Sequence, residues 1–349
     1  MDLFENISSQ EKVDFVNNLS LLIRSGKPIN ESFELLAKQN RNPALKKALE
    51  DAKEKTEKGT PIHKVFEENR HFGNVFVSFI RAGEQSGTLD KNLEFLANWL
   101  QRNNRLKKEI SSATLYPKII ISFALILGAG LAVFVLPQLL PIFNTLDVEL
   151  PFTTRFLLWF SDMIQENGIY ILLTLIALGV GGYFLFKIKA VKNAWDALLI
   201  ELPVVGPIAK EYQLTIVAQL ISTLFRSGVA INESLDIISS SVTNMEYEKA
   251  INQIQKRVEK GTEFAEAMEE HPDIFPSVFI SVVATGEQTG SYGDSFEYLA
   301  NFFAERVSEK TQRLPIVIEP ILLIGIGIFV AFVATAIIMP IYDVTSGIY

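Results

Sequence analysis

The sequence predicts an all-α membrane protein: two homologous cytoplasmic bundles of about six helices each, and three transmembrane helices. Two observations predict this class. The segment Leu-Ile-Arg-Ser-Gly-Lys-Pro-Ile-Asn-Glu-Ser at 22–32 returns as Leu-Phe-Arg-Ser-Gly-Val-Ala-Ile-Asn-Glu-Ser at 224–234, about 202 residues further on. Three long segments, at 119–146, 167–186 and 320–342, contain no charged residue. A repeat of this length indicates a duplicated domain, because the units of solenoids run roughly 20–50 residues.

The first module, residues 1–112, is predicted to be helical throughout. Phe15, Leu19 and Leu22 lie on one face at helical spacing. Thr60 and Pro61 have the residue types of a helix N-cap and a first helical position. Apolar residues at positions 89, 93, 96 and 100 recur at positions 292, 296, 299 and 303, with the same spacing. No convincing strand pattern interrupts these signals, so each module is interpreted as a compact helical bundle, the second at 190–314.

Each module carries a Gly-Glu-Gln-Ser/Thr-Gly motif, at 83–87 and at 286–290. We interpret its glycines, and the glycine of each Arg-Ser-Gly, as structural turns that end helices. The turn glycines are Gly26, Gly83, Gly87, Gly228, Gly286 and Gly290. A phosphate-binding loop is rejected, because it needs a preceding strand and a following Lys-Ser/Thr pair. Glycine capping does not require the repeated carboxylate, so Glu84 and Glu287 are candidate contacts with a partner protein.

Each apolar segment is long enough to cross a hydrocarbon core of about 30 Å, which takes roughly 20 helical residues. Three buried core helices are the alternative, but core helices rarely run so far without a charge on some face. We place the membrane segments in chain order as transmembrane helix 117–143, external loop 144–166, transmembrane helix 167–186, transmembrane helix 318–342 and a short external tail 343–349.

Prolines recur in register in the first and third spans. Pro117 and Pro320 are expected to open these helices, where a missing N–H costs little. Pro137 and Pro340 follow 20 residues later in each case and are expected to mark the exits, because proline bends or ends a helix. The span glycines, at 128, 130, 325 and 327, are interpreted as helix-packing surface.

Basic residues flank the spans on one side. Lysines and arginines precede the first span and follow the second, whereas residues 147–166 hold four acidic residues against Arg155 alone. An excess of Lys and Arg marks cytoplasmic flanks. The N-terminus is therefore expected inside the cytoplasmic (inner) membrane and the C-terminus outside it. The unrepeated span, 167–186, is the return path that lets both modules face the cytoplasm.

The residues offer no catalytic constellation. The chain has no cysteine, and its histidines, at 63, 71 and 271, lack metal-ligand spacing. No basic stripe with interleaved aromatics indicates nucleic acid. We expect no enzymatic activity, no cofactor, no metal and no nucleic-acid partner. Residues 1–112 hold 18 basic and 16 acidic groups, and residues 187–319 hold 12 and 19. Different neighbours for the two modules, or simply a solvated surface, would explain this difference.

Taken in order, the motifs resemble the type II secretion F / type IV pilus inner-membrane platform proteins, over nearly the whole chain. The resemblance rests on the Arg-Ser-Gly and Ile-Asn-Glu-Ser segments, on both Gly-Glu-Gln motifs, and on Tyr116-Pro117 and Glu319-Pro320 at the span openings. The resemblance implies a scaffold that couples a hexameric cytoplasmic assembly ATPase to the extraction and polymerisation of pilin or pseudopilin subunits.

The resemblance also implies a homo-oligomer that contacts membrane lipids and other inner-membrane assembly proteins. The alternative is a transporter or permease subunit built on a parallel domain repeat. A transporter would place charged or strongly polar residues inside its spans. These spans hold none beyond hydroxyl and amide groups.

Overall fold

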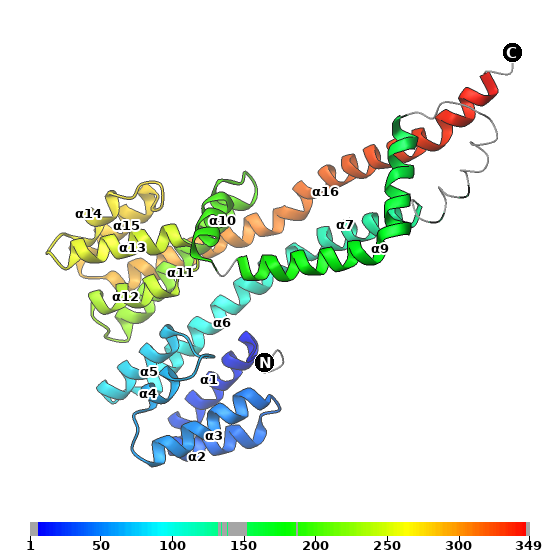
Figure 1. Ribbon diagram of the computed structural model, residues 1–349. Coiled ribbons are helices and arrows are strands. Elements are labelled where there is room, and N and C mark those ends of the chain that lie inside the picture. Colours follow the sequence, from blue (N-terminus) through cyan, green and yellow to red (C-terminus); the bar gives the residue numbers. More distant parts are fainter. Residues whose placement is uncertain (1–5, 132–133, 135–137, 139–151, 186–187, 347–349) are drawn as a thin grey trace. The chain divides into compact units, whose positions relative to one another are not determined.

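The computed structural model describes residues 6–131, 134, 138, 152–185 and 188–346. The chain forms two compact units: the first joins residues 1–109 with 193–310, and the second joins residues 110–192 with 311–349. The described residues of both units are helical and contain no strand (Figure 1). The all-α class is confirmed.

The first unit contains both copies of the repeat. Module 1 consists of α1 (Ser9–Arg24), α2 (Ile29–Gln39), α3 (Pro43–Glu57), α4 (Ile62–Glu67), α5 (Asn74–Ser86) and α6 (Leu89–Ala113). Module 2 repeats them as α11 (Val205–Arg226), α12 (Ile231–Ser241), α13 (Met245–Val258), α14 (Phe264–Glu269), α15 (Ser277–Thr289) and the start of α16 (Tyr292–Ser346). A further helix, α10 (Lys189–Glu201), precedes α11.

Helix starts are fixed by side chains that accept hydrogen bonds from free backbone N–H groups. Ser8 and Glu11 form a reciprocal capping box at α1, with Ser8 N donating to Glu11 Oε2 at 2.7 Å. The backbone N–H of Ser8 lowers the pKa of Glu11. Asn42 caps α3, and its counterpart in the repeat, Asn244, caps α13 in the same way. The duplication therefore preserves local capping as well as apolar spacing.

Each module is built around large aromatic side chains. In module 1, Phe66, Phe72 and Phe76 pack in a cluster, with the ring centres of Phe72 and Phe76 4.5 Å apart. In module 2, Phe279 is fully buried and contacts Phe303, with ring centres 5.8 Å apart. Burying one such side chain stabilises a fold by about 1.5–3 kcal/mol. The apolar stripes predicted from the sequence supply these cores.

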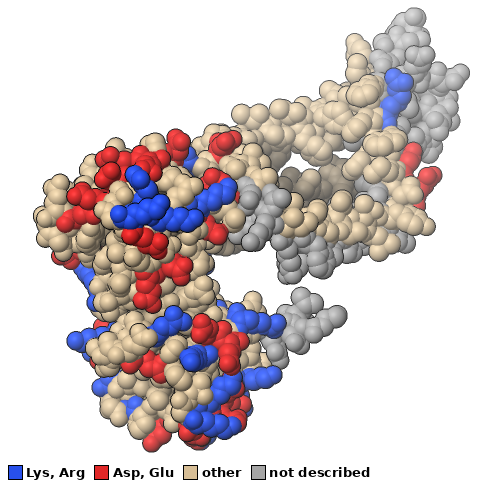
Figure 2. Space-filling view, turned by 60° about the vertical axis from the view of Figure 1, so that its left-hand side comes forward, with Lys and Arg blue, Asp and Glu red and all other residues tan. Residues whose placement is uncertain are grey.

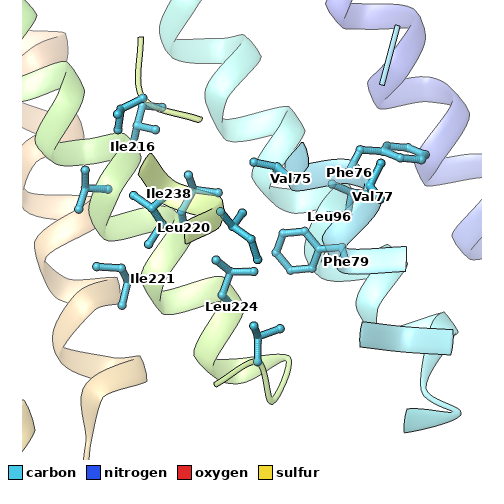
Figure 3. Packing of buried hydrophobic residues seen from close by; sticks show 14 of the residues in the cluster. Val75, Phe76, Val77, Phe79, Leu96, Ile216, Leu220, Ile221, Leu224 and Ile238 are labelled. Carbon is cyan, nitrogen blue, oxygen red and sulfur yellow. The ribbon is translucent and has the colours of Figure 1, made fainter. Parts of the chain in front are cut away.

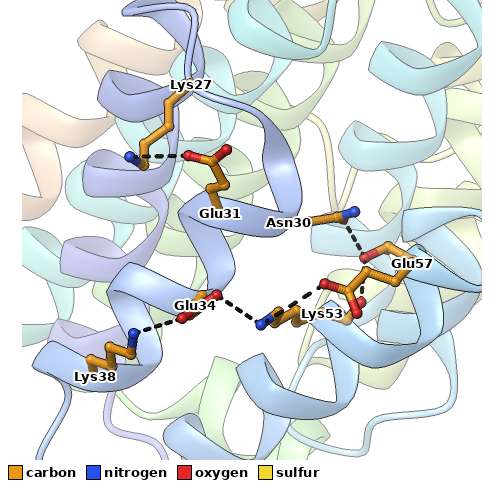
Figure 4. A network of polar contacts seen from close by, with 8 residues as sticks. Lys27, Asn30, Glu31, Glu34, Lys38, Lys53 and Glu57 are labelled. Atoms are coloured by element: carbon orange, nitrogen blue, oxygen red, sulfur yellow. Dashed lines mark hydrogen bonds and ion pairs between the residues drawn. The ribbon is translucent and has the colours of Figure 1, made fainter.

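A network of hydrogen bonds and ion pairs joins α2 to α3 in module 1. Glu34 on α2 accepts hydrogen bonds from Lys38 at 2.6 Å and from Lys53, on α3, at 2.7 Å (Figure 4). The hydrogen bond from Lys38, and then the one from Lys53, lower the pKa of Glu34 to about 2. Glu34 is solvent-accessible, so the pairs orient the helices but stabilise them only modestly.

The second unit contains α7 (Leu115–Gly130), α9 (Phe152–Leu185) and the later part of α16. Figure 2 shows charged side chains gathered over the first unit, whereas the described side chains of the second are almost all uncharged. Two described helical runs are long and apolar enough to cross a membrane, Leu89–Gly130 and Tyr292–Ala336. The predicted span 167–186 coincides with the second part of α9, and its membrane crossing stays a prediction.

Close contacts join the helices of the second unit. A Cβ added at Gly128 of α7 would lie 2.5 Å from the ring of Phe329 on α16, so the absence of a side chain allows this approach. Thr154 of α9 donates to the carbonyl of Ala336 at 2.7 Å. The glycines at 130, 325 and 327 have no neighbour within 4 Å of such a Cβ. Of the span glycines, Gly128 alone therefore packs as expected among the described residues.

The expectation that Pro320 begins a helix and that Pro340 ends one is wrong, whereas their role as boundaries of the span in the bilayer stays a prediction. Pro320 does not begin a helix and Pro340 does not end one, because α16 runs through both from Tyr292 to Ser346. Proline removes one backbone hydrogen bond, but an apolar membrane helix tolerates it, because ending the helix would leave more backbone groups unpaired. Pro117 lies in the first turn of α7, as expected of a helix opening. Pro137 lies outside the described residues.

The segment expected as an external loop, 144–166, is helical from Phe152 onward. It forms the first part of α9, up to non-helical backbone at Asn167 with φ −119° and ψ 15°. Its side chains pack on α16, with the ring centres of Phe156 and Phe332 6.0 Å apart. The acidic residues that suggested a loop lie in a segment that also holds many apolar residues, and the external location of this segment stays a prediction.

Candidate functional site

The repeated carboxylate of module 1 caps a different helix from the one that carries it. Helix α4 begins at Ile62 after Pro61, which has no side chain that can accept a hydrogen bond. Glu84 of α5 supplies the missing acceptor: its Oε1 receives the N–H of Ile62 at 2.7 Å, and its Oε2 receives the N–H of His63 at 3.3 Å. The expectation that Thr60 is the N-cap is therefore wrong.

Module 2 repeats this arrangement. Helix α14 begins after Glu263, whose side chain makes no capping hydrogen bond. Glu287 of α15 accepts the N–H of Phe264 at 2.8 Å and that of Ala265 at 3.0 Å. Burial, and then the neighbouring Glu287 carboxylate, raise the pKa of Tyr292. A negative charge at a helix N-terminus is also favoured by the helix dipole.

These contacts explain why the motif repeats a carboxylate. It ties the end of α5 to the start of α4, and the end of α15 to the start of α14, across more than 20 residues of sequence. Glu84 is about one-quarter exposed, so its carboxylate is largely committed to the fold. The sequence carried one signal of this role: each short helix starts after a residue that does not cap it. Direct contact of Glu84 or Glu287 with a partner stays a prediction.

The glycines of the two motifs divide into two classes. Gly87 and Gly290 have φ of 70° and 69° and end α5 and α15 in the left-handed conformation that glycine favours. Gly26 and Gly228 end α1 and α11 in the same way, with φ of 81° and 83°.

The expectation of turns at Gly83 and Gly286 is wrong, because both lie inside helices. A Cβ at Gly83 would lie 2.8 Å from the Cα of Leu89, and one at Gly286 would lie 2.5 Å from the Oγ of Ser295. These glycines are needed where α5 meets α6 and where α15 meets α16.

An arginine–glutamate pair is a repeated feature that the sequence analysis missed. Arg24 of the first Arg-Ser-Gly contacts Glu94 of α6 at 3.2 Å. Arg226 of the second contacts Glu297, the counterpart of Glu94, and also Asp294 at 2.7 Å. The signal was the equal spacing of arginine and glutamate in both copies. Each pair joins the end of the module's first helix to its last helix.

The two modules share one apolar core. Helix α5 of module 1 packs against α12 of module 2, and the buried residues of both modules form one continuous cluster. In Figure 3, Val75 and Phe79 of α5 point towards Leu220 and Leu224 of α11. Tyr212 of α11 donates to Asn103 of α6 at 3.0 Å. The two modules are therefore packed together through a shared core and are not independent domains joined only by the chain.

The repeat is used asymmetrically in this contact. Val75 is 5% exposed, whereas its counterpart in module 2, Val278, is 38% exposed. Conversely, Leu220 of module 2 is fully buried, and its counterpart in module 1 is the exposed Asn18. Each module thus buries a different face in the contact. At position 18, where module 2 has the buried Leu220, module 1 has an exposed polar residue.

The described residues show no group of three or more metal-ligating side chains. The histidines lie apart and make local contacts. His63 Nδ1 lies 2.6 Å from Glu84, and the carbonyl of His71 accepts a hydrogen bond from Lys12. The backbone N–H of His271 donates to the carbonyl of Met268. The cited contact of His63 is made by its side chain, and those of His71 and His271 are made by their backbone.

The described fold thus consists of duplicated helical modules with one apolar core, attached to long apolar helices. The chain belongs to the family of type II secretion system protein F. The family model matches it twice, over residues 15–137 and 217–340, which correspond to the two copies of the repeat.

Relatives named as type IV pilus assembly proteins and as type II secretion system proteins are similar along nearly the whole chain. The type IV pilus assembly protein PilC of Thermus thermophilus is 28% identical over 95% of this chain and 81% of that protein. PilC of Pseudomonas aeruginosa is 26% identical over 94% of this chain and 88% of its own length. The type II secretion system protein F of Vibrio cholerae is 27% identical over 97% of this chain and 84% of its own length.

Proposed function

We propose that this chain is the non-enzymatic inner-membrane platform of a type IV pilus or type II secretion-like machine. In this role it couples a cytoplasmic assembly ATPase to the extraction and polymerisation of pilin or pseudopilin subunits. The observation that carries the proposal is the shared core of the two modules, in a chain whose family assembles such machines. A rigid body attached to membrane helices can transmit force between a motor and membrane-embedded subunits.

The shared core also supports the proposed topology. Residues 1–109 and 193–310 belong to one compact unit, so no bilayer separates them. The chain between them must therefore cross the membrane an even number of times. Crossings at 117–143 and 167–186 satisfy this condition, and a third at 318–342 leaves the C-terminus outside. The distribution of basic residues supports a cytoplasmic location of the modules, where an assembly ATPase would have access to them.

The repeated carboxylates contribute to this function through the helices that they hold. Glu84 and Glu287 position the N-termini of α4 and α14. We therefore propose that Glu84 and Glu287 act on partner binding by placing these two short helices, in addition to any direct contact.

Deletion and complementation test the proposal. A strain without this gene is expected to lose surface fibres or secretion, and the wild-type gene is expected to restore them. The protein, solubilised in mild detergent, is expected to co-purify with the assembly ATPase of the same machine and to hydrolyse no ATP by itself. Normal fibres and secretion in the deletion strain, or intrinsic ATP hydrolysis by the purified chain, would contradict the proposal.

A further inference from the structure

Helix α10, between the middle apolar segment and module 2, exposes a continuous apolar face. Trp195 and Leu198 of α10 are 47% and 49% exposed, and Leu202, which directly follows the helix, is 38% exposed; together we call them the α10 stripe. These residues follow one another at intervals of three and four, which places them on one side of the helix, and the half-buried Val191 continues the spacing towards the helix start. The stripe ends beside Val204 and Val205, which are also exposed.

The opposite side of α10 is attached to module 2. Asp196 accepts the N–H of Met245, the first residue of α13, at 3.2 Å through Oδ2. The side chain of Asn244 donates to the carbonyl of Asp196, also at 3.2 Å. Ile200 packs against the apolar core. These contacts fix the rotation of α10 on the module, so the stripe faces outward.

Such exposure is unusual for the first unit. Among the described residues at 6–109 and 193–310, the other exposed large apolar side chains are dispersed: they are Leu21, Val278 and Tyr298. Single exposed apolar residues are normal on a soluble surface, but a contiguous apolar patch marks an interaction site.

The chain itself indicates what covers the patch. Helix α9 ends at Leu185 and α10 begins at Lys189. Four residues span at most about 14 Å, so α10 starts close to the end of the middle apolar segment. The sequence there also holds lysines at 187, 189 and 192 and the tryptophan at 195. Lysines attract anionic headgroups, and tryptophan favours the boundary between headgroups and acyl chains.

We propose that α10 is an interfacial helix that lies in the cytoplasmic leaflet, with the α10 stripe among the upper acyl chains. The inference rests on the proposed topology, in which residues 167–186 cross the membrane. An amphipathic helix of this kind lies in the plane of the interface with its apolar side buried. Because Asp196 and Ile200 hold α10 on module 2, the same helix attaches the module to the membrane surface.

Site-directed spin labelling tests the proposal on the full chain in proteoliposomes, and the absence of native cysteine makes single labels specific. Leu198→Cys places a nitroxide on the stripe. Ala197→Cys is the matched control, because it is also exposed but lies about 100° around the helix. The Leu198 label is expected to collide several-fold more with oxygen, relative to a water-soluble nickel complex, than the Ala197 label. Equal ratios at the two positions would overturn the proposal.

A third label separates this inference from the topology. Leu178→Cys lies in the middle segment and is 66% exposed in the isolated chain. An oxygen-rich environment at position 178 with an aqueous one at position 198 overturns the interfacial helix and leaves the topology intact. An aqueous environment at position 178 overturns both. A Leu198 label shielded from oxygen and nickel alike would indicate a protein partner and would also overturn the proposal.

Discussion

Removal of the Glu84 carboxylate should loosen one short helix selectively. In Glu84→Ala, the N–H groups of Ile62 and His63 lose their acceptor, and His63 Nδ1 loses a neighbour at 2.6 Å. The start of α4 has no capping side chain of its own to replace it. The helix has one and a half turns, so opening of its first turn opens most of it.

The size of the effect follows from the two contacts. Replacement of an N-cap acceptor by alanine typically costs about 0.5–2 kcal/mol, and hydrogen bonds to a charged group lie at the upper end or above it. Glu84 is about one-quarter exposed, so solvent reduces the electrostatic part. We therefore expect a loss of about 1–2 kcal/mol, which corresponds to roughly 5- to 30-fold more frequent opening.

Hydrogen exchange measured by mass spectrometry on the full chain in detergent is the appropriate assay, because amide exchange reports local opening. In Glu84→Ala, exchange should accelerate in α4 and remain unchanged in α14. In Glu287→Ala, the pattern should reverse, since Glu287 caps α14. Each variant is therefore the control for the other. Unchanged exchange in α4 of Glu84→Ala would refute the capping argument and would return the carboxylate to the role of a free contact residue.

Three further predictions concern the fold. Gly83→Ala should lower the free energy of unfolding, measured with denaturant, by about 1–3 kcal/mol, because the new Cβ would lie 2.8 Å from the backbone of α6. The control Gly73→Ala, whose Cβ would have no neighbour within 4 Å, should cost less than about 1 kcal/mol. Glu297→Gln should lower the unfolding midpoint more than Glu94→Gln, since Glu297 contacts both Arg226 and Arg102 and is less exposed; equal shifts would contradict this. Hydrogen bonds from lysines lower the pKa of Glu34 to about 2 from 4.5, so its carboxylate stabilises the fold above pH 4.5 and loses this effect as the pH falls towards 2. The difference in thermal midpoint between wild type and Glu34→Gln should therefore be present at neutral pH and narrow over that range, and a constant difference would contradict the assignment.

Local features of this fold could be predicted from sequence because they depend on neighbouring residues. Left-handed glycines after a helix, such as Gly87 and Gly290, follow from an apolar stripe that stops at a glycine. The repeat itself predicted two modules of the same construction. Proline predicted helix ends less well. Pro320 lies inside a continuous helix, because an apolar environment favours paired backbone groups more strongly than proline disfavours the helix.

The features that sequence missed depend on residues far apart in the chain. Glu84 caps a helix 22 residues earlier, and Gly83 matters because α6 folds back against it. The shared core could not be predicted from either copy alone, since identical modules would bury identical faces. It becomes interpretable when counterparts are compared, as in the replacement of exposed Asn18 by buried Leu220.

The central claim is that both modules form one body on the cytoplasmic side of the membrane. The most direct test is labelling of single cysteines in intact cells with a membrane-impermeant thiol reagent, using spheroplasts where an outer membrane intervenes. Ser86→Cys in module 1 and Ser240→Cys in module 2 are both at exposed positions, and both should be protected until the cells are lysed. Ser346→Cys, at the end of α16, should react without lysis. Reaction at position 86 or 240 in intact cells would contradict the topology and, with it, the platform function.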